Sequence, residues 1–148
     1  MDINQLIERL KYLCAVIPPL LENVDEDVFS SKPLPDKWSK KEILGHLIDS
    51  ATNNHQRFIR IQYQNEPTIF YDQNKWNTLN NYNNLSKKHL IQLWLIYNEH
   101  LIEILKIIPE QNLDLLGRTH DRQKHSLQFY IDDYISHLEH HLTQLVSY

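Results

Sequence analysis

Residues 38–47, WSKKEILGHL, mark the start of a long helix, and helical patterns extend from them in both directions along the chain. Ser39 followed three residues later by Glu42 forms a capping box, in which both side chains accept hydrogen bonds from free backbone N–H groups at a helix start. Trp38 before the cap and Ile43 at the fourth helical position form the matching hydrophobic staple. A helix is therefore predicted to begin directly after Ser39.

Three other segments carry apolar residues at the spacing of one helical face. They are residues 3–24, 86–109 and 126–148. In the first of them, Pro18 and Pro19 lack two backbone donors and predict a break or a kink. Ser86 and Ser126 are suitable N-caps for the other two. Together with the helix that begins after Ser39, these segments give four amphipathic helices of comparable length.

The connections between these helices are predicted to be loops. The helix that starts after Ser39 should end near Gln64, because Pro67 follows. Residues 65–85 are rich in asparagine and predict a long loop with one helical turn around residues 75–79. The chain has only 2 glycines and 6 prolines in 148 residues, which argues against a sandwich or barrel with many tight turns. The fold class predicted is all-α, a four-helix bundle formed by one domain over residues 1–148.

Composition excludes some classes of partner. The chain has 15 Lys plus Arg and 19 Asp plus Glu, a net charge of −4, and no basic stripe, so nucleic acid is not an expected partner. It shows no signal-peptide pattern and no apolar run long enough to span a bilayer, so no membrane is expected and a cytoplasmic location is predicted. The one cysteine, Cys14, lies among apolar positions and is interpreted as a small core residue rather than a reactive thiol.

The sequence HLEHH, residues 137–141, carries the first candidate metal ligands. On a helix, His137 and His141 lie within about 40° of each other, at the edge of the apolar stripe, whereas His140 lies about 100° further towards solvent. Imidazoles one turn apart can both bind a divalent ion. Such a pair is common by chance in a chain with 9 histidines, so ordinary packing at the core edge remains an alternative.

A third ligand would favour a metal site, and His46 is the candidate. It lies one turn into the helix that follows Ser39, on the shoulder of the apolar face, with Asn53 and Arg57 along the same side. In a bundle, histidines from two helices can converge on one ion. Asp49, one turn after His46, could orient an imidazole by a hydrogen bond, or it could be an exposed surface acid.

Two motifs resemble one known family. WSKKEILGHLIDS, residues 38–50, resembles the second-helix signature of the DinB/YfiT-like superfamily, and SLQFYIDDYISHLEHHLTQL, residues 126–145, resembles its last helix. YDQNKWN and the later WLIYNEHLIEIL resemble the middle of the YfiT-type branch, so the likeness covers nearly the whole chain. The resemblance implies an up-and-down four-helix bundle that binds one divalent metal, with His46, His137 and His141 as ligands.

The resemblance also implies a range of activities. Members are described as metal-dependent hydrolases, some branches resemble transferases that add a low-molecular-weight thiol to an electrophile, and many form homodimers. Zinc or nickel is the expected ion. Three neutral imidazoles leave at least one coordination position open, where a water or a thiol loses its proton near neutral pH and becomes a nucleophile. The substrate is expected to be a small molecule. A bundle in which the metal or a small ligand is bound without catalysis is the alternative.

Further residues are candidates by position only. Tyr130 and Tyr134 share the helix side of the histidine pair and, with Asp49, could act as general acid or base. Trp76, in the long Asn-rich segment, could belong to a lid over the metal or could simply pack against the bundle.

Overall fold

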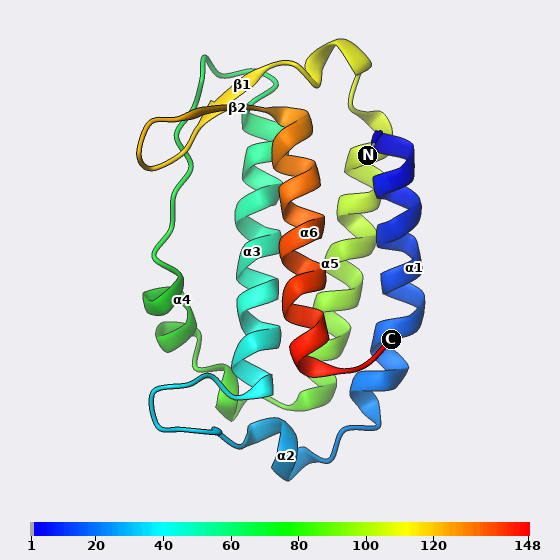
Figure 1. Cartoon of the computed structure of the whole chain (residues 1–148), viewed down its shortest axis with the longest axis vertical. Helices are drawn as coiled ribbons and strands as arrows, with labels where there is room; N and C mark the ends of the chain where they lie inside the picture. Colours follow the sequence, from blue (N-terminus) through cyan, green and yellow to red (C-terminus); the bar gives the residue numbers. More distant parts are fainter. Residues whose placement is uncertain (1) are drawn as a thin grey trace.

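Four long helices run side by side along the axis of the molecule in this computed structural model, which describes residues 2–148 (Figure 1). They are α1 (Ile3–Glu22), α3 (Lys40–Arg60), α5 (Lys87–Ile107) and α6 (Leu127–Leu145). The predicted all-α four-helix bundle is confirmed. α1 packs against α5, and α3 packs against both α5 and α6.

The directions of the helices follow from one long connection. α3 and α5 run in one direction, and α1 and α6 run in the opposite one (Figure 1). Residues 61–86 cause this arrangement, because they return along the length of the bundle before α5 begins. The chain direction therefore does not alternate at every helix, as it does in the simplest up-and-down bundle. α3 and α6 are antiparallel neighbours, and they carry the candidate ligands.

The predicted helix starts are confirmed. Ser39, Ser86 and Ser126 each accept a hydrogen bond from the backbone N–H three residues later, at 3.1 Å. At Ser39 the capping box is complete, because the Glu42 carboxylate accepts from the Ser39 backbone N–H at 3.1 Å. α3 ends at Arg60, slightly earlier than predicted.

The first helix is not broken at its prolines. α1 continues through Pro18 and Pro19 to Glu22. The prolines lack the N–H groups that would donate to the carbonyls of Cys14 and Ala15, so the helix loses two hydrogen bonds here. The neighbouring Ile17 and Leu21 are fully buried, and this burial favours the helical course.

Short elements occupy the segments predicted as loops. They are α2 (Glu26–Ser30), α4 (Gln73–Asn80), two 3₁₀ helices (Tyr82–Asn84 and Glu110–Asn112) and the antiparallel strands β1 (Leu116–Arg118) and β2 (Lys124–Ser126). The helical turn predicted around residues 75–79 lies inside α4. The hairpin was not predicted, because strands of three residues are too short to show an alternating pattern.

The β1–β2 hairpin holds the start of the segment that leads to α4. Thr68 forms a bridge with Arg118, whose backbone N–H donates to the Pro67 carbonyl at 2.9 Å. The Glu66 carboxylate pairs with Arg118 and with Lys124, the latter at 2.8 Å.

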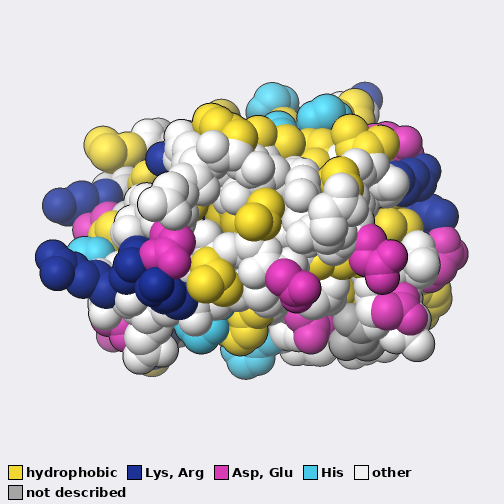
Figure 2. Space-filling model, turned by 90° about the horizontal axis from the view of Figure 1, so that it is seen from above, with side chains coloured by type: hydrophobic (Ala, Val, Ile, Leu, Met, Phe, Trp, Pro, Cys, Tyr) yellow, Lys and Arg dark blue, Asp and Glu magenta, His cyan; other side chains and the backbone are white. Residues whose placement is uncertain are grey.

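Seen from above, Lys and Arg side chains gather at the end of the face where the hairpin lies, and Asp and Glu side chains are more frequent towards the other end (Figure 2).

Apolar side chains from all four long helices fill the core, among them the fully buried Trp94 and Phe58. Cys14 is buried with them, as predicted. α3 is unusual because it also buries a polar row, in which His46, Asp49 and others are at most 4 % exposed. Within residues 2–148, no helix is long and apolar enough to cross a membrane.

Candidate metal centre

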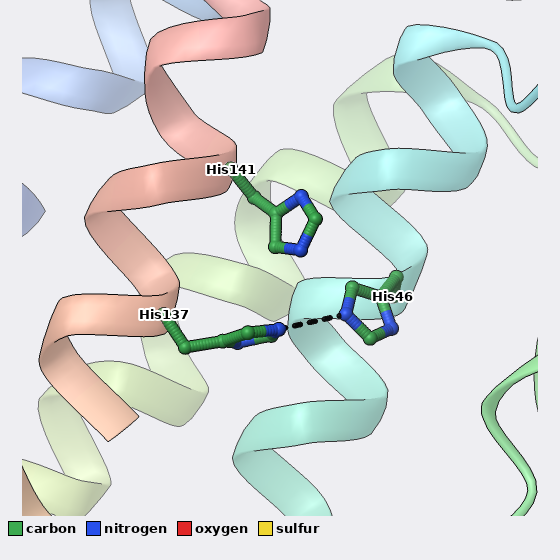
Figure 3. A group of neighbouring side chains, drawn as sticks. All are labelled: His46, His137 and His141. Carbon is green, nitrogen blue, oxygen red and sulfur yellow. Dashed lines mark hydrogen bonds between the residues drawn. The ribbon is translucent and has the colours of Figure 1, made fainter. Parts of the chain in front are cut away.

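Three histidines chosen from the sequence converge between α3 and α6. His46 extends from α3, and His137 and His141 extend from α6, with their rings turned towards one another (Figure 3). Nε2 of His46 lies 3.1 Å from Nε2 of His137. The ring centroid of His141 lies 4.9 Å from that of His46 and 4.6 Å from that of His137. One nitrogen from each residue lies within 4.8 Å of the other two, so a single ion could bind all three.

His140 does not join this group. Its side chain is exposed, although its ring centroid lies 5.0 Å from that of His141. The HLEHH sequence therefore supplies a pair of inward-facing imidazoles and one that faces solvent, as the helical projection predicts.

The protonation of the three histidines suits metal binding. Burial, followed by the nearby charges of His137 and His141, lowers the pKa of His46 to about 3. Burial and then the neighbouring histidines lower the pKa of His137 to about 4. The pKa of His141 is also lowered, mainly by burial. All three rings are therefore neutral near pH 7, and each keeps the lone pair that a metal ligand needs.

Two side chains hold this centre from outside. Trp38 packs against the His46 ring, with centroids 5.0 Å apart and planes tilted by 38°. The Gln144 side-chain oxygen lies 3.2 Å from Nδ1 of His141 and can accept its proton in a hydrogen bond. The sequence pointed to Trp38 only as part of a helix staple and to Gln144 only as part of a family motif, so neither contact was predicted.

Asp49 has other partners than the histidines. Its carboxylate accepts hydrogen bonds from the Tyr82 hydroxyl and from the Asn80 side chain, the latter at 3.2 Å. Burial raises the pKa of Asp49 to about 6. Nδ1 of His46 has no hydrogen-bond partner among residues 2–148. The predicted link from Asp49 to an imidazole is thus not among the contacts of this structure.

The other candidate residues fall into two groups. Tyr134 is only 1 % exposed, and its hydroxyl donates to the Asn98 side chain at 2.6 Å inside the core, away from the histidine cluster. Asn53 is buried on α3 and donates to the Asp49 carbonyl at 2.9 Å. Trp76 is half-buried on α4 and packs edge-on against Tyr71 at 5.5 Å between centroids. α4, which carries Trp76, packs against α3. The lid over the metal stays a prediction, with simple packing against the bundle as its alternative.

Tyr130 lies two turns before His137 on α6. Its ring faces the guanidinium of Arg57 on α3, with 5.3 Å between the guanidinium carbon and the ring centroid. The Tyr130 hydroxyl is buried, and no described residue forms a hydrogen bond with it. The sequence placed Arg57 on the His46 side of its helix but gave it no role.

Cavities open on both sides of the start of α4. One, of about 390 Å³, is lined by residues that include Trp38, Ile43, Asn74 and Gln144, so two of its lining side chains contact the candidate ligands His46 and His141. The other, of about 400 Å³, is lined by Arg57 and residues 70–73. The first of them could admit a small molecule to the neighbourhood of the histidines.

The remaining histidines make ordinary contacts. His55 hydrogen-bonds to the Tyr97 hydroxyl at 2.9 Å, and His120 and His125 stack on phenylalanine rings. In the part of the chain that the structure describes, none of them belongs to a second group of three ligands.

Comparisons with known proteins concern the family and the fold. Residues 10–145 match the DinB superfamily. Among curated proteins, none has a sequence that matches this chain. The fold is similar to that of YfiT from Bacillus subtilis, described as a probable metal-dependent hydrolase with an unusual four-helix bundle topology, with a TM-score of 0.87 and 19 % identity over 97 % of this chain and 83 % of YfiT.

The fold is also similar to that of a mycothiol-dependent maleylpyruvate isomerase, with a TM-score of 0.80 and 13 % identity over 98 % of this chain. A mutant of that enzyme gives the same TM-score at 11 % identity. This chain covers 61 % of the isomerase chain. At these identities the likeness establishes a shared fold.

Proposed function

This chain belongs to the DinB superfamily, and we propose that it is a metal-dependent enzyme that acts on a small molecule through His46, His137 and His141. The observation that carries the proposal is the convergence of these three imidazoles within 4.8 Å from two different helices. Two reactions fit the site: hydrolysis, and transfer of a low-molecular-weight thiol to an electrophile.

The ligand set favours zinc or nickel. Both ions bind neutral imidazole well, and three such ligands leave a position open for a water or another molecule. When bound, the ion would supply Lewis-acid activation of a nucleophile. The protein would orient the ligands. Trp38 packs on His46, and the Gln144 side-chain oxygen keeps the proton of His141 on Nδ1, so that the lone pair of Nε2 is free for the metal.

Thiol transfer is retained beside hydrolysis because of one comparison. A structurally similar enzyme is mycothiol-dependent, whereas YfiT is described as a hydrolase. The cavity lined by Trp38 and Gln144, which contact His46 and His141, has a volume of about 390 Å³, which suits a small organic molecule.

The first experiment measures metal content by mass spectrometry on protein purified without an affinity tag. Wild type is compared with His46→Ala, with His137→Ala/His141→Ala and with His140→Ala as the matched control. We expect about one equivalent of transition metal in wild type and in the control, and loss of the metal in both other variants. Wild-type protein that takes up no zinc or nickel, even after incubation, would contradict the proposal.

A second experiment separates catalysis from metal storage. In cobalt-substituted protein, azide or a thiol should shift the visible spectrum if a coordination position is open. A spectrum that is indifferent to both ligands would favour the alternative, a bundle in which the metal only links α3 to α6. An open site justifies screening thiols with electrophiles, and then esters and amides.

A further inference from the structure

Arg57 carries a positive charge that no acidic residue neutralises. Among the ion pairs of residues 2–148, Arg9 pairs with Glu139 and Arg118 pairs with Glu66, but none involves Arg57. The Arg57 side chain is nevertheless half-buried. Partly buried charges normally have a charged partner, because removing them from water is costly. An arginine without one therefore suggests that the partner is a ligand.

Neutral groups hold the guanidinium in place. Arg57 donates one hydrogen bond to the Asn54 side-chain oxygen at 3.1 Å and another to the Ile69 carbonyl at 3.2 Å. Its guanidinium lies over the ring of Tyr130. A guanidinium has five N–H donors, so donors remain available after these two bonds. The charge is thus positioned without being neutralised.

The position of Arg57 relates it to the metal centre. Arg57 follows His46 by three helical turns and so lies on the same face of α3. Tyr130 precedes His137 by two turns on the antiparallel α6, about 10 Å along the helix axis. The charge of Arg57 is close enough to contribute to the lowered pKa of His137, after burial and the neighbouring histidines. Arg57 therefore lies on the hairpin side of the histidine cluster, about 16 Å beyond His46 along the axis of α3.

A cavity gives a ligand access to this charge. Arg57 and residues 70–73 line about 400 Å³. Asp72, in this wall, is already engaged, because its carboxylate caps α4 through the backbone N–H groups of Asn74 and Lys75. Tyr130 is 4 % exposed, and its hydroxyl, which has no hydrogen-bond partner in the described chain, is a second unused polar group next to Arg57.

We infer that Arg57 binds an anionic group of the substrate, a carboxylate or a phosphate, and so orients the molecule towards the three histidines. The inference deepens the proposed function and rests on it. A guanidinium can donate two parallel hydrogen bonds to a carboxylate or phosphate, which fixes direction as well as position. The substrate class is therefore a small anionic molecule whose charged end and reactive centre are on the order of 10 Å apart.

The test is a titration of metal-free protein followed by ¹⁵N NMR. Acetate, succinate and inorganic phosphate are the anionic probes, and acetamide is the neutral comparator. We expect saturable shifts of the Arg57 Nε–H signal and of the backbone amides of residues 69–73 with carboxylates, with phosphate or with both, and none with acetamide. The anion that saturates identifies which group the site accepts. Absence of saturation with all three anions would overturn the inference.

Variants locate the binding. Arg57→Gln should weaken anion binding at least about tenfold, because a charge-assisted hydrogen bond is lost. Arg57→Lys should retain part of it, since it keeps the charge but not the paired donors. Arg60→Gln is the matched control: Arg60 lies on the same helix, bonded to Gln56 and Gln64, and its loss should not change the affinity. Equal binding by Arg57→Gln and wild type would contradict the inference.

Metal content, measured on the same samples, separates this inference from the proposed function. Arg57→Gln should keep its metal and lose the anion. Wild type that binds anions at Arg57 but takes up no metal would refute the metal-dependent function and leave the anion site standing. Wild type that binds metal but no anion would refute only the anion site.

Discussion

Nδ1 of His141 lies 3.2 Å from the side-chain oxygen of Gln144, and the side-chain nitrogen of the same glutamine lies 3.4 Å from Nε2 of His140. The oxygen can only accept, so Nδ1 of His141 must donate. In a neutral imidazole, the proton on Nδ1 leaves the lone pair on Nε2. Gln144 thus selects the tautomer of His141 that can bind a metal through Nε2.

Replacement of Gln144 should therefore weaken metal binding without abolishing it. Gln144→Ala removes the acceptor for His141, and such partners of metal ligands typically change affinity by about 10- to 100-fold. Gln144 is exposed, so we expect the lower end of that range. Competition with a chelating indicator measures the zinc affinity. Thr143→Ala, at the neighbouring exposed position, should leave it unchanged, and equal affinities for the glutamine variant and wild type would remove Gln144 from the site.

Gly45 should not tolerate a side chain, although it lies inside a helix. Alanine normally stabilises a helix relative to glycine by roughly 0.5–1 kcal/mol. A Cβ at Gly45, however, would lie 2.1 Å from the buried ring of Tyr82. We expect Gly45→Ala to destabilise the protein by on the order of 1–3 kcal/mol, measured by urea unfolding, because the ring must move. In the double variant Gly45→Ala/Tyr82→Ala the two costs should be less than additive; additive costs would show that the contact is not the cause.

Part of the fold and of the site could be predicted because the signals are local. The capping box of Ser39 and Glu42 sets the start of α3 through groups only three residues apart, and so it was visible in the sequence. His137 and His141 share a face because of helical geometry alone. The place of His46 opposite them depended on the packing of two helices, and there the family motif agreed with the helical projection.

The remaining features depend on contacts between distant segments. The tyrosine that packs on Gly45 lies 37 residues later in the chain, and the partners of Asp49 come from the same region. The spacing of apolar residues along the sequence does not predict contacts between such distant segments. The significance of Arg57 depends on its lack of an ion pair with an acidic residue among residues 2–148, which its sequence neighbours do not reveal. The break predicted at the proline pair is absent, because burial near the end of α1 outweighs the lost hydrogen bonds.

Cys14 should react very slowly with thiol reagents in the folded protein. Burial raises the pKa of its thiol from 9.0 to about 12. At pH 8 the thiolate, which is the reactive form, is then about a thousandfold scarcer than in the unfolded chain. Labelling with an aromatic disulfide reagent should be slow in buffer and fast in concentrated urea, with Cys14→Ala as the blank. Equally fast labelling in both would show that the thiol is accessible and that its interpretation as a core residue is wrong.

Asp49 should make the stability of the protein depend on pH. Its pKa is raised from 3.8 to about 6, because burial disfavours the charged carboxylate more than the Tyr82 hydrogen bond favours it. The folded state therefore binds this proton more tightly than the unfolded state does, and stability falls as pH rises from about 4 to about 6. Asp49→Asn keeps an acceptor for Tyr82 and removes the charge. Relative to wild type, the variant should gain on the order of 3 kcal/mol across this window and no more above it.

Urea unfolding at pH 4, 5, 6 and 7 measures this difference. The exposed Asp114→Asn is the control, and its stability relative to wild type should stay nearly constant over the same pH values, because an exposed carboxylate is well solvated in both states. A constant difference between Asp49→Asn and wild type would mean that the carboxylate ionises as easily in the folded protein as in the unfolded chain. In that case the Tyr82 and Asn80 hydrogen bonds would compensate fully for burial. The role of Asp49 would then be to anchor the 3₁₀ helix that follows α4, and its pKa would not be raised.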